Sequence, residues 1–193
     1  MVYLTWFLVL GICLGVGGWQ LAVWLSETRD KSKKYKAASA YALERNKPLL
    51  VAGGPLGISR RRRFFRLGMA HGQGDVCLDI DRRAIGNHPN GVIASVTHIP
   101  FSDKSFGAAF ASHLLEHLPT TDDARKALAE LNRVAEAVFI VYPSRQSIVG
   151  WVIPDHHLWV WQKGNTTYLK QRGKSGGKNK EEYTVEPARE RTS

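Results

Sequence analysis

The chain has 193 residues and a formal net charge of +10. This length leaves room for one domain with a modest core, and the basic charge excludes an acidic, solvating protein. The charge indicates an anionic partner: a lipid surface, a nucleic acid or a phosphorylated molecule. Both cysteines, Cys13 and Cys77, lie in apolar runs. We therefore expect two small buried hydrophobic side chains in a reducing compartment, and no disulfide framework.

Residues 1–26 carry no charge, and we predict that they form a transmembrane anchor. About 20 apolar residues cover the hydrocarbon core of a bilayer. Trp6 near one end, with Trp19 and Trp24 near the other, fits an interfacial aromatic belt. A cleaved signal peptide is disfavoured because a basic first region and a small-x-small cleavage site are absent from the sequence. A buried core helix is disfavoured because the run is apolar on every face.

Residues 27–47 are predicted to form a basic juxtamembrane helix or linker. Positive charge beside a span tends to stay on the cytoplasmic side, which predicts a single-pass membrane protein with its domain in the cytoplasm. The basic side chains can hold anionic lipid head groups or form a plain solvated flank. They are Arg29, Lys31, Lys33, Lys34 and Lys36.

Strand and helix patterns alternate from residue 48 to 142, which predicts an α/β fold with a doubly wound, mostly parallel sheet. The first strand runs into a turn containing Gly53, Gly54 and Gly57. Such a turn before a helix lets backbone amides approach an anionic ligand, although strand-to-helix turns also use glycine for geometric reasons alone. The turn is therefore a candidate cofactor loop.

Five arginines then follow on the next predicted helix, where they are expected to be exposed or bound to anions. They are Arg60, Arg61, Arg62, Arg63 and Arg66. An anionic membrane leaflet is the favoured partner. Nucleic acid is disfavoured, because Phe64 and Phe65 are better explained as core residues than as a stacking platform.

Another predicted strand ends in Asp79 and Asp81, about twenty residues after the glycine turn. At this spacing a carboxylate binds ribose hydroxyls. Asp79 is the first choice for that role and Asp81 the second. The alternative is a loop acid that caps the following segment.

The most informative stretch is residues 99–118. A Pro-containing turn is followed by an apolar run from Phe106 to Ala111 and then by the polar residues Ser112, His113, Glu116 and His117. This pattern resembles the central signature of class I S-adenosylmethionine-dependent methyltransferases, in the subgroup that reads Leu-Pro-Phe, Ser-Phe-Asp, Leu-Glu-His-Leu. The segment 130–134, with its Glu-Leu-Asn-Arg-Val sequence, resembles the end of a helix in the same family.

The resemblance implies a Rossmann-like methyltransferase fold that binds S-adenosylmethionine. Its cofactor residues would be Gly53, Gly54, Gly57, Asp79, Ser95 and His113, with Ser95 in the place that faces the adenine. It also puts His113 and His117 beside the reacting groups, where a neutral imidazole can take a proton from the methyl acceptor. Three positions depart from the family pattern: Val51, Ser95 and Gly107 replace acidic residues.

Two functions stay open at this point. One is a membrane-anchored methyltransferase of unknown acceptor, and the other is a catalytically degenerate protein of the same fold that acts as a membrane-associated binding or scaffold module. The sequence does not indicate an oligomeric state.

The run from His113 to His117 also matches the inverted zinc-protease motif His-x-x-Glu-His. That motif needs a helix and a downstream acidic ligand in a folded segment, so we predict no metal site here. The domain is expected to span residues 48–162 and to be truncated at its C-terminal end. Residues 163–193 are expected to form a basic, mostly disordered tail, in which only 166–169 and 183–185 resemble strand fragments.

Overall fold

The computed structural model describes residues 2–54, 73–164, 166–173 and 180–184. Its main sheet has the strand order β3-β2-β1-β4-β5, and all its strand pairs are parallel. The strands are β1 (Leu49–Ala52), β2 (Val76–Asp79), β3 (Gly91–Ile93), β4 (Phe106–Ser112) and β5 (Ala135–Val141). The predicted doubly wound, parallel α/β sheet is confirmed.

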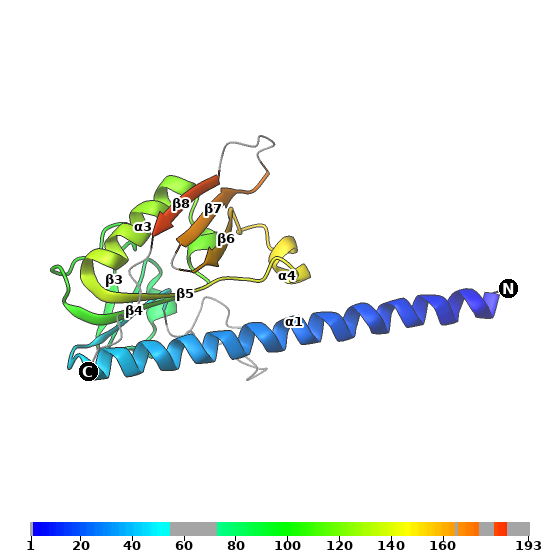
Figure 1. The fold of residues 1–193 in the computed structure, drawn as a ribbon, viewed down its shortest axis with the longest axis horizontal. Helices are drawn as coiled ribbons and strands as arrows, with labels where there is room; N and C mark the ends of the chain where they lie inside the picture. The colour runs from blue at the N-terminus through cyan, green and yellow to red at the C-terminus, as the bar shows by residue number, and fades with distance from the viewer. Residues whose placement is uncertain (1, 55–72, 165, 174–179, 185–193) are drawn as a thin grey trace.

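Helix α1 (Val2–Glu44) runs without a break through the predicted anchor and the predicted juxtamembrane segment. Its C-terminal part covers one face of the sheet (Figure 1). There Ala38, Tyr41 and Ala42 are buried in a cluster that includes Val51 and Phe110. The same helix therefore serves as a core element at one end and as an exposed rod at the other.

The opposite face of the sheet is covered by α3 (Thr121–Val134). Thr120 caps this helix, because its Oγ1 accepts a hydrogen bond from the Asp123 backbone N–H at 3.1 Å. Leu128 and Leu131 are fully buried beneath it. Both features can be read in the sequence, as a threonine before the helix and apolar residues at helical spacing within it.

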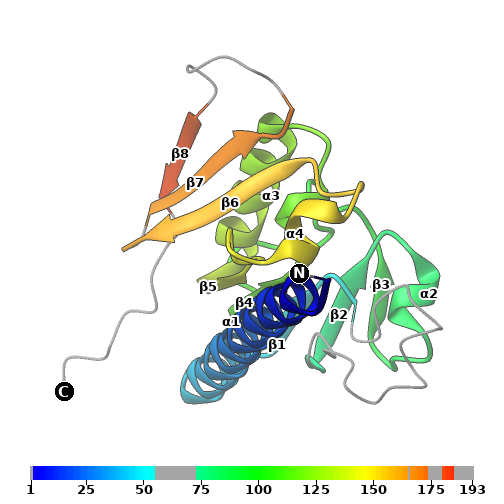
Figure 2. The same ribbon diagram turned by 90° about the vertical axis from the view of Figure 1, so that its right-hand side faces the viewer.

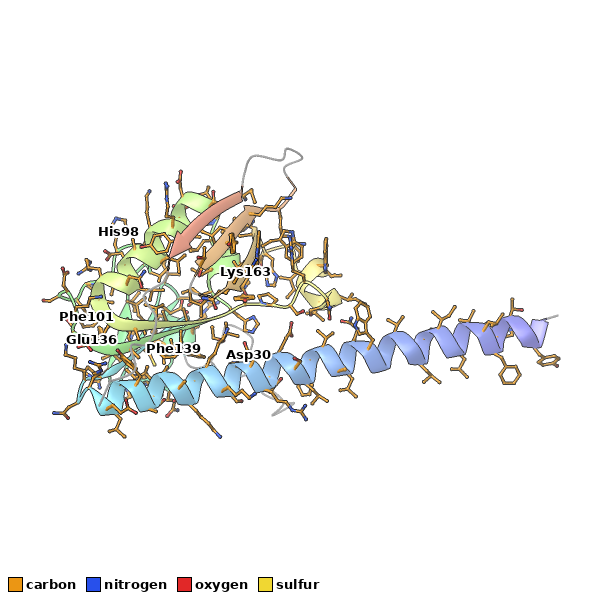
Figure 3. All side chains as sticks on the ribbon, in the orientation of Figure 1. Asp30, His98, Phe101, Glu136, Phe139 and Lys163 are labelled. Atoms are coloured by element: carbon orange, nitrogen blue, oxygen red, sulfur yellow. The ribbon has the colours of Figure 1, made fainter. Side chains whose placement is uncertain are left out.

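The N-terminal half of α1 extends beyond the domain, and its side chains project on all sides (Figure 3). Its most apolar window has a mean hydropathy of 1.9, and only 6% of that window is buried. A core helix of a soluble protein would be mostly buried. The helix is thus long and apolar enough to cross a membrane, as predicted, although length and composition alone do not separate an anchor from a signal sequence.

Two residues of the basic flank face the domain. Lys31 is only 6% exposed, and its burial lowers the pKa of its amine to about 8. Lys34 Nζ donates a hydrogen bond to the Ile140 carbonyl at 2.8 Å. The exposed basic residues of this flank are Arg29, Lys33 and Lys36.

A second, antiparallel sheet contains β6 (Leu158–Lys163), β7 (Thr166–Gln171) and β8 (Lys180–Thr184), in the order β6-β7-β8 (Figure 2). The expectation of a disordered tail from residue 163 is wrong for these strands. Thr167 and Leu169 alternate inward on β7 and are fully buried. This inward alternation is short and one of its two residues is a threonine, so the composition of the segment does not reveal a strand. The main sheet still ends at β5.

Three short elements join the strands. They are α2 (Arg82–Ile85), the 3-10 helix η2 (Leu115–His117) and α4 (Ile148–Val152). Gly57 and the arginine-rich helix lie outside the described residues.

Candidate cofactor edge and histidine cluster

The direction of strand addition reverses between β1 and β4, and ligands of open α/β sheets bind outside the carboxyl ends of strands at such a point. Gly53 follows β1 with φ +108°, and its N–H donates to the Leu78 carbonyl at 2.9 Å. A Cβ at Gly53 would lie 3.5 Å from the Ser112 carbonyl oxygen. The turn after β1 thus adjoins the ends of both β2 and β4.

Gly54 has a packing reason of its own. Its φ is +68°, and a Cβ there would lie 2.7 Å from both Cβ and the carbonyl oxygen of Ala84 on α2. No side chain fits this contact, with or without a ligand. Gly54 therefore carries less information about a cofactor than Gly53 does.

Asp79 and Asp81 have different roles. Asp81 is the N-cap of α2, and its Oδ1 accepts a hydrogen bond from the Arg83 N–H at 2.8 Å. Asp79 is half-buried at the end of β2, where its Oδ1 accepts from the Asp81 N–H at 2.7 Å. Burial is the main cause that raises the pKa of Asp79. The capping alternative thus applies to Asp81, and Asp79 is the carboxylate at the end of the strand.

Two of the departures from the family pattern have structural explanations. Val51 is completely buried within β1, in register with Cys77 and Phe110 on the neighbouring strands. Ser95 closes a local turn, since its Oγ lies 2.8 Å from Thr97 Oγ1 and accepts from the Thr97 N–H at 3.2 Å. Neither side chain is a ready polar contact for a cofactor.

His113 follows β4 directly, in a left-handed backbone conformation with φ 51°. Such a conformation in a non-glycine residue costs on the order of 1–3 kcal/mol and clusters at functional sites. Its Nδ1 lies 3.2 Å from Oε1 of Glu116, a carboxylate that is completely buried. His113 is thus held at the sheet edge by its neighbour in η2.

His117 is exposed, and its Nδ1 lies 3.1 Å from the Asp155 carbonyl oxygen. Its ring packs edge-to-face on His156, with centroids 4.8 Å apart. In the sequence, His156 lies in the tryptophan-rich segment 150–161, and this position does not indicate a contact with η2. The backbone bond from His157 N–H to the Glu116 carbonyl, at 2.7 Å, makes that contact. Nothing in the sequence spacing indicates it.

The described part of the surface contains hollows near the site. One of about 590 Å³ lies between the segment 97–100 and α3, and none of the predicted site residues lines it. Another, of about 370 Å³, is bordered by α4, the segment after it and the end of β7, and it includes His156 in its lining.

Residues 68–137 match the model of a family described as "Methyltransferase domain". The match covers less than half of the chain. None of the curated proteins matches. Three solved chains match, including the crystal structure of the PH0226 protein from Pyrococcus horikoshii OT3. It is 11% identical, covers 81% of this chain and 76% of its own, and has a TM-score of 0.40. The strand order and the family match together confirm the predicted Rossmann-like methyltransferase fold.

Proposed function

We propose that this chain is a membrane-anchored, S-adenosylmethionine-dependent methyltransferase of unidentified acceptor. The observation that carries the proposal is the convergence of Gly53, Asp79 and the segment after β4 on one sheet edge. This edge is the switch point of a parallel sheet, and the match to methyltransferase domains covers Asp79 and β4.

The residues at this edge fit the cofactor in part. The Asp79 carboxylate stands at the end of β2, where it can accept hydrogen bonds from ribose hydroxyls, and Gly53 leaves room for a ligand to approach the backbone. Val51 offers no polar atom for the methionine end, and Ser95 is engaged by Thr97. We expect the ribose contacts to dominate binding.

In the proposed reaction, a histidine accepts the proton that the methyl acceptor loses. When bound, S-adenosylmethionine supplies an electrophilic methyl group. His113, positioned by Glu116, or His117 can accept a proton from an acceptor hydroxyl or amine, as neutral imidazole does near pH 7. Correct orientation of the acceptor contributes to the rate in either case.

The membrane part of the proposal is supported by α4 as well as by α1. The Gln20 side chain donates to the Gln146 carbonyl at 3.0 Å and accepts from the Ile148 N–H at 2.9 Å. Residues 2–19 thus precede the first of these contacts, and at 1.5 Å per residue they span about 27 Å, close to the hydrocarbon thickness. The exposed apolar side chains of α4 lie beside that point; they are Ile148, Val149, Trp151 and Val152.

We therefore place the bilayer surface at Gln20 and α4, with the domain on the cytoplasmic side and the N-terminus outside. The exposed residues Arg29, Lys33 and Lys36 follow the span and agree with this orientation. They are also available to anionic head groups. Because the domain is held at the surface, a lipid or another membrane-delivered molecule is the favoured methyl acceptor.

The test is transfer of a tritium-labelled methyl group from S-adenosylmethionine to membrane extracts by the full chain in lipid vesicles. We expect labelling that depends on the chain and falls about 100-fold in His113→Ala if this residue takes the proton. The matched control is His98→Ala, an exposed histidine that is not among the predicted catalytic residues, which keeps the activity. If the wild-type chain labels no component of the membrane extract, the proposed methyltransferase activity is wrong.

A second function keeps support from particular residues. Val51, Ser95 and Gly54 each have structural roles that need no cofactor. A degenerate methyltransferase fold that serves as a membrane-bound scaffold has this character. Binding of S-adenosylmethionine without methyl transfer, or neither property, would favour it.

A further inference from the structure

A cluster of three possible metal ligands combines two residues of the segment after β4 with one from the segment before β6. One ligand atom from each of Glu116, His117 and His156 lies within 4.8 Å of the others. Glu116 and His117 come from η2, and His156 comes from the segment between α4 and β6. Two segments distant in the chain thus bring nitrogen and oxygen donors to one point, which is the donor set that zinc and related divalent ions prefer.

Both histidine rings place Nδ1 beside a backbone carbonyl oxygen. Nδ1 of His117 lies 3.1 Å from the Asp155 carbonyl oxygen, and Nδ1 of His156 lies 3.1 Å from the Gly150 carbonyl oxygen. A carbonyl only accepts, so each Nδ1 carries the proton and each Nε2 keeps its lone pair. Metal-bound histidines commonly donate their second nitrogen to a backbone carbonyl in this way.

The carboxylate of Glu116 needs a further partner. The residue is 0% exposed, Oε1 lies 3.2 Å from His113 Nδ1, and Oε2 has no hydrogen-bond partner in the described structure. A buried carboxylate oxygen without a partner is costly, and a bound cation removes that cost.

We propose that Glu116, His117 and His156 bind one divalent transition-metal ion, with zinc the best match, and that His113 orients the Glu116 carboxylate. Three protein ligands leave a coordination position open, as in catalytic zinc sites. The hollow of about 370 Å³ that includes His156 gives access to it. Metal binding can be tested without methyl transfer, but an ion on His117 would leave proton acceptance in the proposed reaction to His113.

Binding requires a small closure of the cluster. Ligand atoms that share a tetrahedral zinc ion lie about 3.4 Å apart, because the bonds are about 2.0–2.1 Å long. His117 is exposed and can rotate inward with little loss of packing. The set shares Glu116 and His117 with the inverted zinc-protease motif but differs from it, since His156 is the third ligand and His113 pairs with Glu116.

The experiment is a titration of the full chain, without a polyhistidine tag and stripped of metal, in detergent with Zn²⁺ against a chromophoric chelator. We expect one ion per chain, and a loss of affinity of at least about 10-fold in His117→Ala and in Glu116→Gln. The matched control is His157→Ala, an exposed neighbour whose ring is outside the set, which keeps the wild-type affinity.

The visible absorption spectrum of bound Co²⁺ gives a second test, which separates loss of the metal site from loss of folding. Co²⁺ bound to the wild-type chain is expected to show the intense visible bands of a four-coordinate site, and these bands are expected to disappear in His117→Ala, whose circular dichroism stays native. Equal zinc affinity in wild type and His117→Ala, or equal losses in His117→Ala and His157→Ala, would overturn the proposal. A cobalt spectrum typical of the hexaaqua ion would do the same.

Discussion

Arg133 stabilises the Pro-containing turn that precedes β4. Its guanidinium donates to the Ile99 and Phe101 carbonyls at 2.9 and 2.8 Å and to the Asp103 carboxylate at 2.8 Å. It also pairs with Glu130, whose Oε2 accepts from the Ile99 N–H at 2.8 Å. The Glu-x-x-Arg part of the family resemblance is therefore a clamp on the turn before β4, with no need of a catalytic role.

We predict that Arg133→Met lowers the free energy of unfolding by about 1–3 kcal/mol, because two carbonyls and two carboxylates lose a charged donor. The hydrogen bond from Arg133 holds the pKa of Glu130 below its usual range. This stabilisation is present above the ordinary carboxyl pKa of about 4.3 and is lost as the pH falls through the lowered folded pKa.

Urea unfolding at pH 7 and at pH 3 measures this effect, with Arg125→Met, a more exposed arginine on the same helix, as the control. The control is expected to change stability by less than about 1 kcal/mol. A deficit in Arg133→Met that is as large at pH 3 as at pH 7 would contradict the assignment to the Glu130 pair.

Gly107 is the third departure from the family pattern, and packing explains it. A Cβ at this position would lie 2.8 Å from the Cα of Ala42, where α1 crosses β4. The usual acidic side chain has no room beneath this helix. The departure reflects the way that α1 covers the sheet and carries no information about catalysis.

Gly107→Ala is expected to destabilise the chain by about 1–3 kcal/mol, because backbone atoms of α1 must move. Thermal unfolding followed by circular dichroism measures the loss. Gly17→Ala is the matched control, since a Cβ there meets nothing within 4 Å. Equal melting temperatures for the two variants would show that α1 does not pack this closely on β4.

In the proposed arrangement, α1 and α4 are the two elements that meet the membrane. Gln20 links the two helices through backbone groups of Gln146 and Ile148. Val152 on α4 is 71% exposed, although it is apolar. A membrane surface at this level would cover it, together with the exposed N-terminal half of α1.

We predict that Val152→Cys, in a Cys13→Ser chain reconstituted into lipid nanodiscs, reacts with a water-soluble maleimide at least about 10-fold more slowly than Lys126→Cys. The physical reason is that acyl chains and head groups exclude the reagent from α4. Lys126 is exposed on α3, on the opposite face of the sheet from α1, and serves as the control. Equal labelling rates would place α4 in water and remove it from the membrane surface.

The elements that the sequence predicts well are those with strong periodicity or strong caps. The strands around Leu50, Leu78, Phe110 and Val138 are short apolar runs, and α3 has a capping threonine and a clear apolar stripe. The antiparallel strands β7 and β8 were not expected as a sheet, because few apolar residues mark them. The change of composition at residue 26 predicts a boundary between an anchor and a juxtamembrane segment. The backbone has no boundary there, because α1 continues without a break.

The sequence predicts only those site residues that directly follow a predicted strand. Gly53 and Asp79 were found because loops at the carboxyl ends of parallel strands converge. The partner of Glu116 was not found, since the contact between η2 and His156 depends on how the chain returns after β5. Gly57 lies outside the described residues, and its role stays a prediction.

The molecule as a whole carries three proposed features: an anchor, a cofactor edge and a histidine cluster. The bilayer is assigned to the exposed half of α1 and to α4, the cofactor to the edge at Gly53 and Asp79, and a metal ion to the cluster around Glu116. The net charge of +10 is consistent with an anionic membrane partner. Each of these three assignments can fail without the others.

The most direct measurement is calorimetric titration of the full chain in detergent with S-adenosylmethionine and with its demethylated product. We predict saturable binding at one site, weakened about 10- to 100-fold by Asp79→Asn, because the charged acceptor for the ribose hydroxyls is lost. Asp81→Asn keeps the helix cap, since asparagine caps as well as aspartate, and is expected to bind normally. No heat of binding at millimolar ligand, or equal losses in the two variants, would contradict a cofactor site at this edge.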